Sequence, residues 1–150
     1  MANTKQIIEN QLNTLLTRNY DAEAGFNKVA KEVTDKSLET YLLNKASERK
    51  AFGYEIKDEL KSIEGEINKG TSLEGDMHRA WIDVKSVVGK NDVESMLDEI
   101  LRGEKVAVEE YEKVIENDDI LLSTKEVLQR QKDQINYTRS ATELMDEISA

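Results

Sequence analysis

Four polar residues interrupt the apolar stripes of this chain at places where metal ligands lie in some helical bundles. They are Glu23, Glu48, Glu104 and Gln131, and each lies near the middle of a long stretch with helical periodicity. Carboxylates that point together into a helical core can hold two iron or manganese ions, with histidines completing the coordination. The chain has a single histidine, His78, which lies far from all four in the sequence. The pattern therefore indicates a carboxylate-bearing core without the histidines that such a metal centre normally uses.

The spacing around two of these residues departs further from a di-metal site. Such a site takes a Glu from each of two helices and a Glu-x-x-His pair from each of two others. Glu23 and Glu104 match the single-Glu positions, but Ala51 stands where a His would follow Glu48, and Gln131 offers a neutral amide. Amides are weak ligands for a hard cation. We therefore predict no catalytic residue and no cofactor, and we keep these four polar residues as alternative ligands for iron or manganese.

The other interpretation of the same residues is a structural polar layer that sets how the helices pair. A buried Glu needs hydrogen-bond donors. The same stretches contain six candidates, which are Asn19, Lys45, Arg49, Gln131, Gln134 and Tyr137. Lys45 and Arg49 interrupt the apolar stripe of their own segment, and we expect their charged ends to reach solvent. We prefer this structural interpretation to a metal site.

Five segments with helical periodicity carry these residues. They cover about 4–33, 36–69, 72–88, 92–117, and a last segment that begins between 119 and 124. Asp35 is placed to cap the second segment, and Gly70 is its predicted end. Gly53 lies inside that segment, where Gly costs about 1 kcal/mol relative to Ala, so we expect another helix to approach closely there.

The connections between the segments predict the topology. Short loops join the first two segments and the last two, which predicts two antiparallel hairpins. If the segment at 92–117 begins at the same end as the turn near Asp35, then Glu23, Glu48 and Glu104 share one level of the core. The opposite arrangement would offset Glu48 and Glu104 by about 13 Å. We therefore predict an all-α, ferritin-like four-helix bundle with a helical crossover, at 72–88, between the second and third bundle helices.

Three stretches resemble a known group of proteins. They are residues 21–26 (DAEAGF), 78–85 (HRAWIDVK) and 102–111 (RGEKVAVEEY). Together they resemble an uncharacterised bacterial family of ferritin-like four-helix bundles, a domain of unknown function. The resemblance covers nearly the whole chain and implies the bundle fold. It implies no reaction, because no activity is firmly assigned to the family.

Composition limits the functions that we expect. The chain has 150 residues, no Cys, no Pro, and a net charge of −10, so it fits a single domain over 1–150 and is repelled by nucleic acids and anionic membranes. Residues 1–15 lack the pattern of a signal peptide, so we expect a cytoplasmic protein.

Taken together, these features predict a non-enzymatic bundle that acts as a homo-oligomer, such as a dimer, or through an unknown protein partner. A stress-related role rests on analogy of fold alone. The alternatives are a metal-binding or degenerate di-metal carboxylate protein, and a carrier of a small apolar ligand.

Overall fold

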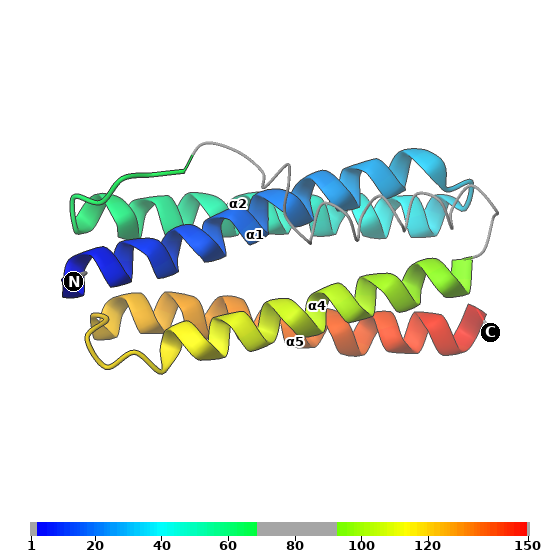
Figure 1. Cartoon of the computed structure of the whole chain (residues 1–150). Helices are drawn as coiled ribbons and strands as arrows, with labels where there is room; N and C mark the ends of the chain where they lie inside the picture. The colour runs from blue at the N-terminus through cyan, green and yellow to red at the C-terminus, as the bar shows by residue number, and fades with distance from the viewer. Residues whose placement is uncertain (1–2, 69–92, 150) are drawn as a thin grey trace.

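In a computed structural model of the chain, residues 3–68 and 93–149 are described, and they form four α-helices and no strand (Figure 1). The helices are α1 (Thr4–Glu32), α2 (Lys36–Ser62), α4 (Val93–Ile115) and α5 (Leu122–Ser149). The prediction of an all-α fold is confirmed for these residues. No helix among them is both long enough and apolar enough to cross a lipid bilayer. The predicted helix at 72–88, with His78 and Trp81, lies outside the described residues.

Local capping explains where the helices begin. The Asp35 side chain accepts a hydrogen bond from the backbone N–H of Leu38 at 2.9 Å, so the predicted cap of α2 is confirmed. Helix α5 begins differently, because the backbone N–H of Lys125 bonds to the carbonyl of Leu121 at 3.0 Å. Leu121 therefore occupies the N-cap position, although its side chain cannot accept a hydrogen bond from the first turn.

Helix α2 ends at Ser62 rather than at Lys69, so the predicted length of this segment was wrong. Glu64 has a φ of 56°, and the N–H of Gly65 bonds to the carbonyl of Leu60 at 2.9 Å. This is the left-handed C-terminal motif that closes many helices, here with Glu in the position that Gly usually takes. The apolar spacing continues past this point, which is why the sequence suggested a longer helix.

After this turn the chain reverses and follows α1. The backbone N–H of Asn68 donates to Asn13 Oδ1 at 2.9 Å, and the Asn13 side chain donates to the carbonyl of Glu66 at 2.9 Å. The Tyr20 hydroxyl donates to the carbonyl of Asn68 at 3.3 Å. Residues 66–68 therefore run beside α1 in the same direction as that helix.

The four helices form two antiparallel hairpins, α1 with α2 and α4 with α5, which lie side by side (Figure 1). Helices α1 and α4 are antiparallel, because Gln11 bonds to Asn117 at 2.7 Å and Arg18 bonds to Glu110 at 2.9 Å. Helices α2 and α4 consequently point the same way. Figure 1 shows α2 ending near the N-terminus of the chain, whereas α4 begins at the opposite end of the bundle.

The described core consists of two apolar clusters along the bundle axis. One cluster contains Ala22, Phe26, Val29, Ala30, Leu38, Leu42, Ala46 and Ile100. The other contains Leu12, Leu15, Leu16, Phe52, Ile56, Leu60, Val108, Tyr111, Val114, Ile120, Leu128 and Ile135. On α1, α2 and α4 a buried polar residue falls between the two clusters, and these residues are Asn19, Arg49 and Glu104. On α5 the buried Gln131 lies between Leu128 and Ile135 of the second cluster. A polar layer therefore separates the two halves of the core.

Gly53 does not require the close approach that we expected from the sequence. It is buried on α2, but a methyl group added there would lie 3.6 Å from Leu16 Cδ1. That is an ordinary van der Waals distance, so the packing of α1 against α2 leaves room for alanine.

Candidate functional site

Arg49 lies at the centre of the polar layer. It projects from α2 with 1% of its surface exposed. Its Nε donates to Asn19 Oδ1 at 2.6 Å, and its Nη1 donates to Glu104 Oε1 at 2.6 Å. The prediction that Arg49 reaches solvent was therefore wrong. A carboxylate on α4 lies within reach of the guanidinium, and this ion pair compensates the buried charge.

Tyr111 and Gln131 extend this arrangement to the fourth helix. Asn19 Nδ2 donates to the Tyr111 hydroxyl at 2.8 Å, and that hydroxyl donates to Gln131 Oε1 at 2.6 Å. Gln131 Nε2 in turn donates to the carbonyl of Phe52 at 3.2 Å and to Glu55 Oε1 at 3.1 Å. We call Asn19, Arg49, Glu104, Tyr111 and Gln131 the central network. It connects α1, α2, α4 and α5 by direct hydrogen bonds.

Burial controls the protonation of the central network. Burial raises the pKa of the Glu104 carboxyl above its ordinary value, and the adjacent Arg49 guanidinium acts in the opposite direction. Burial also raises the pKa of Tyr111 to about 12, so its phenol is neutral and can donate to Gln131. A buried guanidinium needs an anionic partner. The guanidinium therefore depends on Glu104 as its counter-ion.

Glu48 belongs to a second, half-buried cluster at the edge of the α2–α5 contact. Its carboxylate accepts hydrogen bonds from Gln134 at 3.0 Å and from Lys45 and Thr138 at 3.5 Å each. Lys45 was correctly expected to donate to a Glu, although Glu48 is half-buried rather than buried. Its side chain is 16% exposed, so its charged end lies in a partly solvated ion pair rather than in open solvent.

The structure therefore separates the four predicted site residues. Glu104 and Gln131 join the central network, whereas Glu48 lies in the half-buried cluster beside it. Glu23 is half-buried one turn beyond Asn19 on α1, and Asn19 takes the place in the network that the sequence suggested for Glu23. Asn19 interrupts the apolar spacing of its segment, and that interruption was the available signal. Tyr111 lies on the regular apolar stripe of α4, so nothing marked it as a polar contact.

These residues do not fit a di-iron or di-manganese centre. The carboxylates of Glu104 and Glu48 are each bonded to a cationic side chain of the protein, Arg49 and Lys45 respectively. Among the side chains of residues 3–68, 98 and 100–141, no three of His, Cys, Asp or Glu are grouped to hold a metal ion. A bridging carboxylate must offer its oxygens to two metals, and the guanidinium of Arg49 competes directly for those of Glu104.

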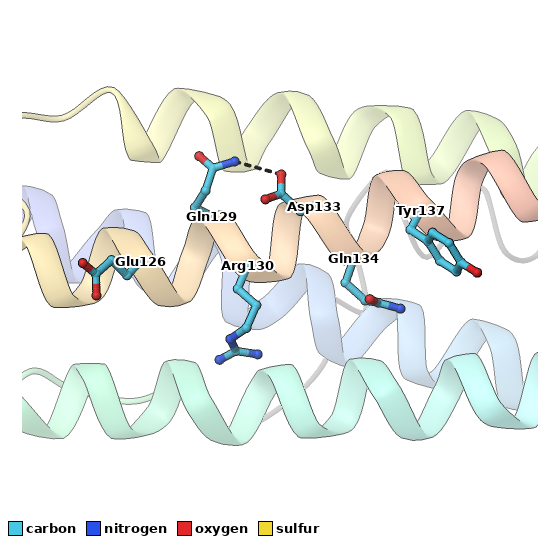
Figure 2. A pocket seen from close by; sticks show the side chains of 6 residues that line it. All are labelled: Glu126, Gln129, Arg130, Asp133, Gln134 and Tyr137. Atoms are coloured by element: carbon cyan, nitrogen blue, oxygen red, sulfur yellow. Dashed lines mark hydrogen bonds between the residues drawn. The ribbon is translucent and has the colours of Figure 1, made fainter.

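The outer face of α5 carries a hollow of about 500 Å³. Six side chains line it, as Figure 2 shows, and they are Glu126, Gln129, Arg130, Asp133, Gln134 and Tyr137. We call this set the α5 face. Tyr137 is 69% exposed, so the prediction that it donates to a buried Glu was wrong. All six side chains carry a polar group, and Gln129 Nε2 donates to Asp133 Oδ1 at 2.9 Å within the set.

The fold and this centre define a helical protein whose core is organised around an ion-paired polar layer. Residues 7–117 match the domain of unknown function DUF2383, and the chain belongs to this family. The prediction of a family of unknown function is confirmed. The matched stretch includes four members of the central network and ends before α5, which carries Gln131. A comparison with curated proteins finds no match.

Proposed function

We propose that this protein is a non-enzymatic, ferritin-like four-helix bundle that acts through its surface, by assembly with copies of itself or by binding a protein partner. The observation that carries the proposal is the Arg49–Glu104 pair at the centre of the core. In a di-metal bundle that place belongs to the metals and their bridging carboxylates. Here a side chain of the protein supplies the positive charge, and its role is structural.

Two features support the ferritin-like topology in this proposal. Helices α2 and α4 point the same way, so Ser62 and Val93 lie at opposite ends of the bundle (Figure 1). Residues 66–68 have already turned back along α1, toward the end where α4 begins. A crossover between the second and third bundle helices needs this reversal.

The chemistry of the partner follows from charge. With 31 acidic and 21 basic residues, the protein repels polyanions, so a protein surface is a better partner than a nucleic acid or an anionic membrane. The ordered contacts in the central network give the bundle a defined shape, which a binding surface requires.

Metal binding by the purified, untagged protein tests the proposal. The protein is incubated with ferrous iron or with manganese, desalted, and analysed for bound metal, and its melting temperature is measured with and without each ion. We expect no stoichiometric metal and no change in melting temperature. One or two metals per chain, lost in Glu104→Gln but retained in the exposed Glu126→Gln control, would overturn the structural assignment of the network.

A further inference from the structure

The six side chains of the α5 face carry both signs of charge. Arg130 is basic, and Glu126 and Asp133 are acidic. A second copy can therefore set its acidic groups against Arg130 and its Arg130 against the acidic groups of this face. Tyr137 exposes 69% of its surface within the face, which adds apolar area to the polar side chains.

The α5 face is also complementary to itself. Suppose two α5 helices lie antiparallel about a two-fold axis that passes between Gln131 and Lys132. Residues at equal distances on either side of this midpoint then face each other across the axis. Arg130 faces Asp133 of the partner subunit, which places a guanidinium against a carboxylate. A two-fold interface requires this kind of match, because the same patch meets itself.

The remaining lining residues also face complementary side chains across the two-fold axis. Gln129 faces Gln134 of the partner subunit, and two amides can exchange hydrogen bonds. Glu126 faces Tyr137 of the partner subunit, where a phenol can donate to a carboxylate. The six side chains of the α5 face thus form three complementary pairs, and each pair occurs twice in the dimer.

We propose that the α5 face is the contact surface of a homodimer in which α5 packs antiparallel against α5 of a second copy, with Arg130–Asp133 pairs at its centre. The proposal rests on the proposed function, in which the protein acts by assembly. Arg130 already bonds to Glu55 on α2, and its side chain is 57% exposed, so part of it stays accessible to a second copy. Gln129 holds Asp133 at 2.9 Å on the same face (Figure 2).

Sedimentation velocity over a range of protein concentrations at low salt tests the dimer. We expect the wild-type protein to self-associate with a Kd on the order of micromolar, as suits a polar interface. Arg130→Asp and Asp133→Arg each place like charges opposite one another twice, and each should weaken the dimer by at least about tenfold. The double variant Arg130→Asp/Asp133→Arg restores both pairs and should dimerise within about threefold of the wild type.

Mixing the two single variants gives the sharpest result. Arg130→Asp has two acidic residues at the centre of the face, and Asp133→Arg has two basic ones, so the mixture should form a heterodimer that is tighter than the homodimer of either variant. Two controls separate this effect from folding. Glu55→Gln removes the partner of Arg130 within the chain and should leave the dimer intact, and Asp118→Arg changes an exposed charge outside the face.

The outcomes distinguish the two proposals. A wild-type protein that is monomeric at the highest soluble concentration, or a dimer that neither single variant weakens, overturns the α5 interface. A dimer that neither single variant weakens still agrees with action by assembly, through another surface. Stoichiometric metal bound through Glu104 would overturn the proposed function and would say nothing against the α5 contact.

Discussion

Substituting Arg49 by Met tests the central network most directly. Methionine has a similar length and no charge, so the change removes the ion pair while keeping most of the packing. Glu104, 4% exposed, is then left in the core without its counter-ion, and Asn19 Oδ1 loses the donor that lies at 2.6 Å. Removing one partner of a buried ion pair costs about 3–5 kcal/mol of unfolding free energy.

The loss of unfolding free energy in Arg49→Met should depend on pH. Because the pKa of Glu104 is raised in the folded protein, its contribution to stability is complete below the ordinary value of 4.5 and is lost as pH rises through the folded-state pKa. Arg49 lowers that pKa, so its removal raises the pKa further and extends the fall in stability to higher pH. We expect the full loss near pH 8, and about 1–3 kcal/mol near pH 4, below the ordinary value of 4.5, where a carboxyl with a raised pKa is protonated.

The reverse substitution, Glu104→Leu, should behave differently. An arginine guanidinium cannot neutralise itself when its counter-ion is removed. We expect a loss of about 3–5 kcal/mol near pH 8. The double variant Arg49→Met/Glu104→Leu buries no charge, and its stability should lie within about 1 kcal/mol of the wild type or above it.

Urea unfolding followed by far-UV circular dichroism measures all four proteins at both pH values. The coupling free energy of the double-mutant cycle gives the strength of the interaction between the two side chains. Additive losses in the double variant would refute the reasoning, because they would mean that the two side chains do not compensate each other. Equal losses in Arg49→Met near pH 4 and near pH 8 would refute the assignment of the raised pKa.

Three further substitutions should stabilise the protein, and thermal or urea unfolding measures each. Gly53→Ala should raise the unfolding free energy by about 1 kcal/mol through helix propensity, unless the 3.6 Å contact with Leu16 proves repulsive and stability falls. Glu64→Gly should add about 1 kcal/mol by relieving the left-handed φ of 56°, and an unchanged midpoint would contradict this. Leu121→Asp should add about 1 kcal/mol by capping α5, whereas Ser123→Asp, inside the first turn, should add less. Equal gains from the two Asp variants would indicate a general charge effect rather than a cap.

Apolar periodicity was sufficient to predict the described helices and the level of the polar layer. The stripes at three- and four-residue spacing place α1, α4 and the start of α5 within a few residues of their observed bounds. Counting residues from the turn near Asp35 predicted that Glu48 and Glu104 share one level of the core, and Arg49, next to Glu48, bonds to Glu104. Their positions follow from helical rise alone, which needs no knowledge of contacts between helices.

The identity of the central cation could not be predicted in the same way. Whether Arg49 reaches solvent or stays buried depends on its distance from Glu104, 55 residues away in the sequence. That distance depends on how the two hairpins dock. Asn19 and Glu23 lie one turn apart on α1, and a small rotation of the helix decides which one faces the network. At the end of α2, the apolar spacing continues through Ile63. The spacing therefore gave no sign of the left-handed turn at Glu64.

The ion pair also determines how the two hairpins align with each other. Arg49 belongs to the α1–α2 hairpin and Glu104 to the α4–α5 hairpin, so each half of the molecule carries one of the two charges. Sliding one hairpin along the other by a single helical turn, about 5.4 Å, would separate the pair and leave both charges without a partner in an apolar core. Most misaligned dockings are therefore penalised by electrostatics as well as by shape. If the chain were cleaved between residues 68 and 93, one fragment would carry Arg49 and the other Glu104. The pairing of these two charges would still favour the native alignment of the two fragments.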